Sequence, residues 1–342
     1  MEKVSIIGLD LAKRSFQAHG ARADGGVEFR KKFSREKLLA FLAEQSRCVV
    51  AMEACGSAHH WGRAIRELGH DVRLIPPAYV KPFVKRQKND AADAEAICEA
   101  ASRPTMRFVA IKTQEQQARA MLFRTRDLFV RQRTQLINAL RGHLSEYGLV
   151  APQGLANVKV LAEAIDVVKT SLPLLVVELS RVFLEQIDLL SKKIVELEQA
   201  TVHEAARGAL TRRLQTMPGV GPITAMAIET FSPPMTIFKR GRDFAAWLGL
   251  VPRQHSTGGK QILGKTSKMG QRDIRRLLII GAIAVVRWAC RKGAPDGTWL
   301  HRMLARKPRM LVAIALANKM ARSIWAMLIK GEDYRVPGAA TA

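Results

Sequence analysis

Near its N-terminus the chain reads Val4-Ser5-Ile6-Ile7-Gly8-Leu9-Asp10, a run of β-forming residues that ends on an acidic one. A second run, Cys48-Val49-Val50-Ala51-Met52-Glu53, ends in the same way. Short, mostly apolar runs that are rich in valine and isoleucine are typical of buried strands. The two runs therefore predict strands that each present a carboxylate where the strand stops.

The segments around these runs predict the strand order of a ribonuclease-H-like fold. The turn Asp24-Gly25-Gly26 separates two further strand patterns, and Gly69 closes a helix before the next strand. The predicted elements are strands over 15–21 and 27–33, a helix over 34–46, a strand over 48–53, a helix over 59–68 and a strand over 71–75. Three strands followed by alternating helix and strand place the ends of the first and fourth strands side by side.

Two more carboxylates, Asp90 and Asp93, lie three residues apart at the start of a helical pattern, on one helix face. Together with Asp10 and Glu53 they can converge on a pair of divalent ions, which suits phosphodiester chemistry. An oxygen-only site of this kind favours Mg²⁺ or Mn²⁺. Each residue taken singly fits an ordinary turn or helix cap, but the four in this order favour a catalytic metal site.

The charge of the chain indicates a nucleic-acid partner. The chain has 55 Lys and Arg against 30 Asp and Glu, a net charge of +25. Residues 211–342 hold 23 basic and 6 acidic residues, whereas residues 1–210 hold 32 and 24. An excess of this size is typical of proteins that displace counterions from phosphates. The uneven distribution suggests a catalytic N-terminal part and a DNA-contacting C-terminal part.

The middle of the chain predicts two long helices. Residues 113–146 and 174–200 carry apolar residues at helical spacing, which indicates an antiparallel hairpin or coiled-coil arm, with an ordinary helical bundle as the alternative. Arginines decorate the first helix, and we expect them either to line a nucleic-acid backbone or to solvate an exposed face. They lie at positions 119, 124, 126, 131, 133 and 141.

Cysteine spacing and hydropathy bear on the compartment. The four cysteines show no metal-binding or redox spacing, so we expect reduced, structural thiols. The N-terminus has no cleavable signal pattern. No apolar run approaches the roughly 18–20 residues of a membrane span, and the apolar stretch 277–286 is predicted to be a buried helix. These features predict a cytoplasmic, nucleoid-associated protein with no membrane partner.

Residues 217–225, Met-Pro-Gly-Val-Gly-Pro-Ile-Thr-Ala, are similar to the hairpin of a helix-hairpin-helix element. Gly219 and Gly221 would let the backbone approach a phosphate, and the following helix N-terminus would offer N–H groups. A plain turn between two helices is the alternative.

A polar, basic loop follows an apolar helix at residues 253–260, and Ser256 is its candidate nucleophile. Arg253 and Lys260 would neutralise developing charge, and His255 is either a base or a bystander. From the residues alone, a structural turn or a phosphate cradle at Gly258 and Gly259 fits the loop better than covalent catalysis does. Downstream, Lys265 and Lys268 continue the basic character, and Ser267 is a rival hydroxyl.

Five blocks of this chain resemble one family, the DEDD transposases of bacterial insertion sequences, also described as bridge-RNA-guided recombinases and related to pilin-gene invertases. The blocks are Gly8–Lys13, Met52–Gly56, Lys88–Ala94, Pro218–Gly221 and Trp247–Lys260. They occur in order, and the resemblance covers nearly the whole chain. Each block is weakly specific by itself, whereas the set is specific.

The resemblance implies a RuvC-like catalytic domain over 1–108, a helical coiled-coil segment over 109–205, a transposase domain over 206–335 and a tail over 336–342. It places Asp10, Glu53, Asp90 and Asp93 on the metal-binding tetrad and Ser256 on a serine that forms a phosphoserine intermediate. A structured noncoding RNA would choose donor and target, and the two domains of a composite site would come from different subunits of a homo-oligomer, a dimer or tetramer.

The predicted function is therefore an RNA-guided, Mg²⁺-dependent serine recombinase that moves an insertion sequence. A RuvC-like nuclease or junction resolvase without a covalent intermediate is the alternative. A non-catalytic nucleic-acid-binding protein would keep the charge but would not need the four carboxylates.

Overall fold

The computed structural model describes residues 4–85 and 89–335 and divides into two compact units, which meet in the sequence at Gln114 and Glu115. The predicted tail 336–342 and Lys88 lie outside the described residues. Because each unit has its own core, we describe them separately. The predicted domain boundaries at 108 and 205 stay predictions.

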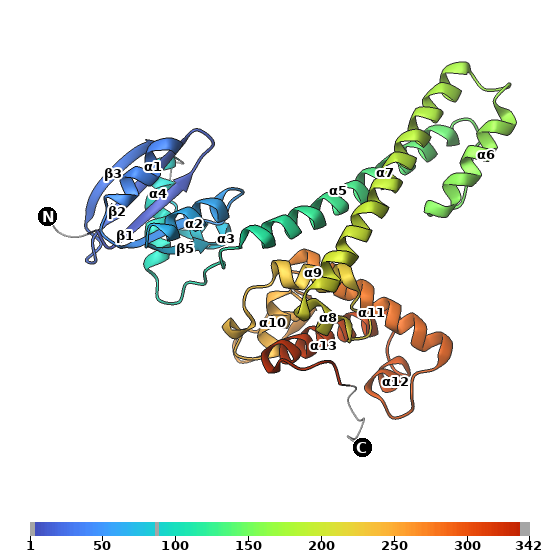
Figure 1. Cartoon of the computed structure of the whole chain (residues 1–342). Helices are drawn as coiled ribbons and strands as arrows, with labels where there is room; N and C mark the ends of the chain where they lie inside the picture. Colours follow the sequence, from blue (N-terminus) through green and yellow to red (C-terminus); the bar gives the residue numbers. More distant parts are fainter. Residues whose placement is uncertain (1–3, 86–88, 336–342) are drawn as a thin grey trace. The chain divides into compact units, whose positions relative to one another are not determined.

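The first unit is a five-stranded mixed sheet with helices on both faces (Figure 1). Its strands are β1 (Ile6–Leu11), β2 (Ser15–Ala21), β3 (Val27–Ser34), β4 (Val49–Glu53) and β5 (Asp71–Ile75). Its helices are α1 (Arg35–Ala43), α2 (Ala58–Glu67), α3 (Pro77–Val80), the 3₁₀ helix η1 (Lys81–Phe83) and α4 (Asp90–Ser102). The sheet order is β3-β2-β1-β4-β5.

The strand directions confirm the predicted neighbours. β1 and β2, and β2 and β3, are antiparallel, while β1 pairs in parallel with β4 and β4 with β5. The first and fourth strands therefore end at the same edge of the sheet. This order, with helices on both faces, is consistent with the predicted ribonuclease-H-like fold.

Alternation along the strands fills two separate cores. Ile7 and Leu9 of β1 pack with residues of α1 and α2 on one face. Ile6 packs with residues of α4 on the other face. The hydrophobic contacts that bury both faces therefore fix α4 against the strand that carries Asp10.

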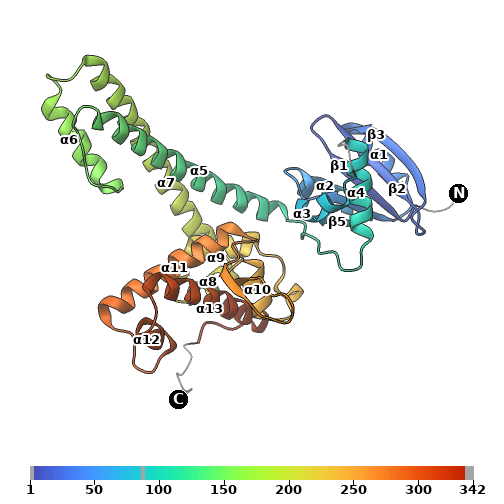
Figure 2. The same cartoon turned by 180° about the vertical axis from the view of Figure 1, so that it is seen from behind.

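The second unit begins with a helical arm made of α5 (Gln114–Ser145), the 3₁₀ helix η2 (Leu155–Asn157), α6 (Val158–Val168) and α7 (Leu174–Arg207). α5 and α7 run in opposite directions side by side (Figures 1 and 2). Salt bridges and hydrogen bonds join them in antiparallel order, at Arg119–Glu204, Arg126–Glu198 and Arg133–Ser191. The helices α5 and α7 thus form a helical hairpin.

Four arginines of α5 have bonding partners within the second unit. Arg119, Arg126 and Arg133 bond to α7, and Arg119 also pairs with Glu229. Arg141 donates to the carbonyl oxygens of Ala151 and Gly154, at 3.2 and 3.1 Å. Internal bonding therefore accounts for these four arginines better than either predicted role, nucleic-acid contact or simple solvation.

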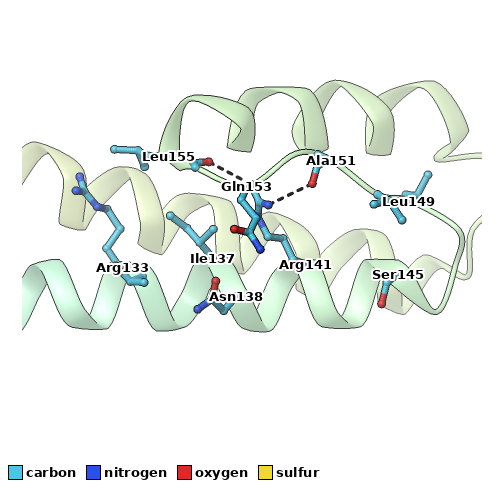
Figure 3. A pocket seen from close by; sticks show the side chains of 12 residues that line it. Arg133, Ile137, Asn138, Arg141, Ser145, Leu149, Ala151, Gln153 and Leu155 are labelled. Atoms are coloured by element: carbon cyan, nitrogen blue, oxygen red, sulfur yellow. Dashed lines mark hydrogen bonds between the residues drawn. The ribbon is translucent and has the colours of Figure 1, made fainter. Parts of the chain in front are cut away.

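A cavity of about 690 Å³ lies at the end of α5, between this helix and the chain that leads to α6 (Figure 3). The two hydrogen bonds of Arg141 cross it (Figure 3). Arg141 thus holds the chain that leads to α6 against the end of α5.

The rest of the second unit is mainly helical around one core. Its helices are α8 (Ala209–Gln215), α9 (Pro222–Phe231), the 3₁₀ helix η3 (Met235–Ile237), α10 (Gly241–Trp247), α11 (Arg272–Lys292), α12 (Trp299–Leu304) and α13 (Arg309–Lys330). A two-stranded ribbon, β6 (Pro252–Gln254) and β7 (Leu263–Thr266), interrupts them. The sequence predicted a loop here.

Among the described residues, α13 is the one helix long and apolar enough to pass the length and composition test for a membrane span. The prediction that no run approaches this length was therefore wrong for α13. Val312, Ala317 and Ile324 of this helix are buried in the core of the second unit. α13 is thus accounted for as a core helix, and the predicted helix at 277–286 lies within α11.

Candidate functional site

Strand alternation turns Asp10 and Glu53 toward the same face of the first unit. In β1, Ile6 and Gly8 face α4, so Asp10, two residues further, faces it too. In β4, Val49 and Ala51 pack in the core on the α4 side, which gives Glu53 the same orientation. The parallel register pairs Leu9 with Met52, so the two acidic residues follow as neighbours.

α4 brings the other two carboxylates to this edge. Asn89 caps the helix, since its side-chain oxygen accepts the backbone N–H of Ala92 at 2.7 Å. Asp90 and Asp93 lie in the first turn, where the free N–H groups and the helix dipole stabilise negative charge. The sequence after Asn89 therefore starts the helix at the point where two acidic side chains reach the end of β1.

Three of the four predicted carboxylates come together. Asp10, Asp90 and Asp93 each offer an oxygen, and these atoms lie within 4.8 Å of one another. We call these three residues the acidic group. Glu53 lies outside this group, although its charge acts on Asp10.

The electrostatics of the acidic group agree with its geometry. Burial raises the pKa of Asp10 to about 6, and nearby negative charges add to the effect. In decreasing order these charges belong to Asp93, Asp90 and Glu53. Close carboxylates repel one another, and a bound cation would remove this repulsion.

The donor atoms test which ion the acidic group fits. All are carboxylate oxygens, the ligands that hard divalent ions such as Mg²⁺ and Mn²⁺ prefer. Asp90 is exposed and Asp10 and Asp93 are half-buried, so water and substrate oxygens can complete the coordination. The residues present fit such an ion.

Ser256 lies in the second unit, on a ribbon that we call the serine hairpin, residues 252–266. Its turn is closed by mutual backbone hydrogen bonds between Thr257 and Lys260. The residues between them, Gly258 and Gly259, have φ of 54° and 75°, as in the type I′ turns that favour hairpins. The positive φ angles of the turn thus account for glycine at both positions, independently of phosphate binding.

The Ser256 hydroxyl is exposed and accepts the backbone N–H of Ile262 at 3.3 Å. Arg253, Lys260 and Lys265 on the same hairpin are also exposed. The ring of His255 lies over Gly264, where an added Cβ would come within 3.1 Å of it. The hairpin therefore presents the Ser256 hydroxyl among several cations.

Tight backbone packing anchors the base of the serine hairpin. An added Cβ on Gly249 would lie 2.0 Å from the carbonyl oxygen of Met269. The Ser267 N–H donates to Val251 and the Lys268 N–H to Gly249. Lys268 takes a positive φ of 55°, which is uncommon outside glycine. A fixed base with an exposed tip suits a residue that must meet a large substrate.

The glycines of the helix-hairpin-helix-like segment differ from each other. Gly219 has φ of 86° and packs against α11, where an added Cβ on Gly281 would meet the Gly219 oxygen at 1.9 Å. Gly221 is exposed and precedes α9. Close packing thus accounts for Gly219, as the alternative of a turn between helices predicts, and the phosphate-binding role stays a prediction.

The four cysteines are free thiols, as predicted. Burial raises the pKa of Cys48 and Cys98 to about 11, which keeps both thiols protonated and unreactive at neutral pH.

A mixed sheet that holds a group of aspartates, joined to a basic and mainly helical unit, is consistent with a metal-dependent enzyme acting on nucleic acid. Two family models match the chain. A model of the DEDD transposases of IS110, described as "Transposase", matches residues 7–149, and one described as "Transposase IS116/IS110/IS902 family" matches residues 211–295. The chain belongs to this family of insertion-sequence transposases.

Three relatives support the same assignment. The chain is 48% identical over 337 residues to a probable family 20 transposase of Pseudomonas aeruginosa, covering 98% of this chain and 99% of the relative. It is 41% identical over 334 residues to the transposase for insertion sequence element IS1328 of Yersinia enterocolitica, with 98% and 99% covered. The transposase for element IS1111A of Coxiella burnetii is 38% identical over 340 residues, with 98% and 92% covered.

The protein is therefore a DNA transposase. Membership of a DEDD family, together with the acidic group, indicates that the enzyme depends on a divalent metal ion. DNA is its partner.

Proposed function

We propose that this transposase moves its insertion sequence by serine-mediated strand exchange, guided by a structured noncoding RNA. The observation that carries the serine part is the exposed Ser256 hydroxyl on an anchored hairpin with Arg253, Lys260 and Lys265. The net charge of +25 and the family resemblance support the RNA part. Homo-oligomerisation belongs to the same proposal.

In the proposed step, the Ser256 oxygen attacks a DNA phosphorus and passes its proton to water as the new O–P bond forms. The bond from phosphorus to the leaving strand breaks, and the oxygen of that strand takes up a proton. Attack by a hydroxyl of the partner strand then releases the serine, so the number of phosphodiester bonds is conserved. The Ile262 N–H, which donates to the Ser256 oxygen, would stabilise negative charge on that oxygen as the proton leaves.

The acidic group and Glu53 would hold the divalent ions, with Mg²⁺ as the expected ion and Mn²⁺ as the substitute. Such ions stabilise charge on attacking and leaving phosphate oxygens. The protein's own part is to keep Asp10, Asp90 and Asp93 deprotonated and close together when the ion is bound.

The acidic group also supports a second candidate function. Carboxylates that bind two ions can activate water directly, which would make the enzyme a RuvC-like nuclease or resolvase in which Ser256 only binds phosphate. The two functions differ in their products, since hydrolysis leaves free ends and the serine route leaves protein joined to DNA.

Trapping of the covalent species tests the proposal. Wild type, Ser256→Ala and Ser267→Ala are incubated with element-end DNA, the adjacent noncoding RNA and Mg²⁺, and protein–DNA adducts are measured after denaturation. We expect adducts in wild type and Ser267→Ala, and none in Ser256→Ala. Omitting the RNA is expected to abolish adduct formation at the element ends. Cleaved DNA without adduct in any sample would establish the hydrolytic alternative.

A further inference from the structure

One end of the second unit carries positive charge that its own carboxylates do not neutralise. Residues 287–311, which we call the basic end, comprise the end of α11, all of α12 and the start of α13. Both views show α12 in the connection beyond the end of α11 (Figures 1 and 2). Its seven cations, all exposed, are Arg287, Arg291, Lys292, Arg302, Arg306, Lys307 and Arg309.

Few acidic residues lie near this positive charge in the sequence. Between Asp273 and Glu332 the only acidic residue is Asp296, and Asp296 pairs with His301 at 3.0 Å. Across residues 4–85 and 89–335, no ion pair to any of the seven cations is found. The basic end therefore has a strongly positive electrostatic field, and no carboxylate of the described residues neutralises its seven cations.

The bonds that these side chains do make leave their charge intact. Arg302 donates to the carbonyl oxygen of Gly297 at 2.6 Å, and Arg306 donates to that of Arg302 at 3.2 Å. A neutral carbonyl fixes the guanidinium without neutralising it. By contrast, Arg119 and Arg126 of the arm are paired with carboxylates.

An aromatic side chain stands among the cations. Trp288 is 56% exposed, although a tryptophan usually buries most of its large apolar surface. Arg291 and Lys292 follow it by three and four residues on α11, which places them beside it on the helix surface. An exposed ring between cations is the arrangement that stacks on an unpaired base while the cations bind the backbone.

We propose that the basic end binds a single-stranded segment of nucleic acid, with Trp288 stacking on a base and the surrounding cations neutralising phosphates. A protein partner would have to supply a matching excess of carboxylates to neutralise seven cations, whereas a nucleic acid carries a negative charge on every nucleotide. Residues 296–311 lie beyond the segment 211–295 that the family model matches. The proposal deepens the nucleic-acid part of the proposed function and does not depend on Ser256.

Direct binding measurements test the proposal. The full chain is titrated into labelled single-stranded DNA, single-stranded RNA and duplex DNA of equal length, none carrying element-end sequence, at several salt concentrations. We expect Trp288→Ala to weaken single-strand binding about 10-fold, the effect of losing one stacked base. Duplex binding should change little, because duplex bases are already stacked. Trp288→Phe should restore most of the affinity.

The cations are tested by a triple change, Arg302→Gln, Arg306→Gln and Lys307→Gln. We expect the slope of log affinity against log salt to become less steep by about 2, as for three lost phosphate contacts on a single strand. The matched control is Lys159→Gln, Lys192→Gln and Lys193→Gln, which removes the same charge from exposed, ion-paired residues of the arm. The control should keep the wild-type slope.

Each outcome bears on the proposal. Tighter binding of RNA identifies the guide as the natural strand, and tighter binding of DNA identifies a separated strand of the element. Equal losses in the two triple variants would overturn the proposal, since only overall charge would then matter. So would binding of anionic lipid vesicles that Trp288→Ala abolishes while oligonucleotide binding is unchanged. Because the oligonucleotides are not recombined, failure here leaves the Ser256 experiment unaffected.

Discussion

At the scale of single residues, Asp10 carries the most information about the acidic group. Its pKa is raised from 3.8 to about 6, so the metal-free folded state binds more protons than the unfolded state between these values. The contribution of Asp10 to the stability of the metal-free protein therefore falls as the pH rises from 4 to 6. A divalent ion requires the deprotonated carboxylate, so ion affinity should rise with pH over the same range.

We therefore predict that Mg²⁺ or Mn²⁺ raises the unfolding temperature of the first unit at pH 7.5 by about 5 °C at saturating concentration. At pH 5 the increase should be much smaller. Thermal unfolding with and without the ion, and with EDTA as the control, measures this difference. Asp10→Asn should remove the increase at both pH values, and an undiminished increase in that variant would contradict the metal assignment of Asp10.

The residue scale also separates catalysis from binding. Asp10→Ala and Asp93→Ala should abolish transposition, by at least about 100-fold, because each removes a ligand of the proposed ions. Binding of DNA should remain close to wild type, since the cations are untouched. Transposition at wild-type rate in either variant, measured by excision of the element, would show that these carboxylates are not needed.

At the scale of elements, the packing of α4 on β1 positions the acidic group. A Cβ added to Gly8 would lie 2.2 Å from the carbonyl oxygen of Ala94 and 2.6 Å from the backbone nitrogen of Cys98. Backbone atoms of a helix cannot rotate away as a side chain can, so α4 must move. Glycine at position 8 is thus required for the distance between Asp10 and the first turn of α4.

We predict that Gly8→Ala destabilises the first unit by about 2 kcal/mol, as overpacking does, and weakens divalent-ion binding at the same time. Chemical denaturation and calorimetric ion titration measure the two effects. Gly56→Ala is the matched control, because no atom lies within 4 Å of its added Cβ. Unchanged ion affinity in a destabilised Gly8→Ala protein would show that the acidic group does not depend on this packing.

At the scale of the whole molecule, some positive side chains are paired inside the protein and others are exposed. Arg119, Arg126 and Arg133 of the arm are engaged in salt bridges and hydrogen bonds with α7. The cations of the basic end and the serine hairpin are exposed. The net charge of +25 is a sum over the whole chain. Taken as an average, it overstates the positive charge that the arm presents to a partner and understates that of the basic end.

We predict that DNA affinity falls about 1,000-fold or more between 50 and 200 mM salt, as expected for six or more phosphate contacts. Element-end and unrelated DNA should lose affinity in parallel, because phosphate contacts carry no sequence information. Fluorescence anisotropy at increasing salt measures the slope. A slope near zero would mean that the exposed cations do not contact phosphates.

The pattern along the chain was enough to predict the strands of the first unit and the family. Short apolar runs ending in Asp10 and Glu53, and an acidic helix start after Asn89, led to the correct strand order and to three residues that lie together. Such signals are local, since periodicity, caps and turns depend on residues close in the chain. The order of the five sequence blocks along the chain likewise predicted the family.

Only the tertiary structure decided what the polar side chains contact. Three arginines of α5 bond to α7, and Arg141 bonds to the loop that follows α5. The segment around Ser256 pairs into a hairpin, and Gly219 meets Gly281 of α11. Trp288 stays exposed, although its size predicts burial. These outcomes depend on partners beyond the local helical or strand period, for example 10 residues away for Arg141 and Ala151 and 58 for Arg133 and Ser191. A pattern read along the chain contains no information about which of two such partners is nearer in space.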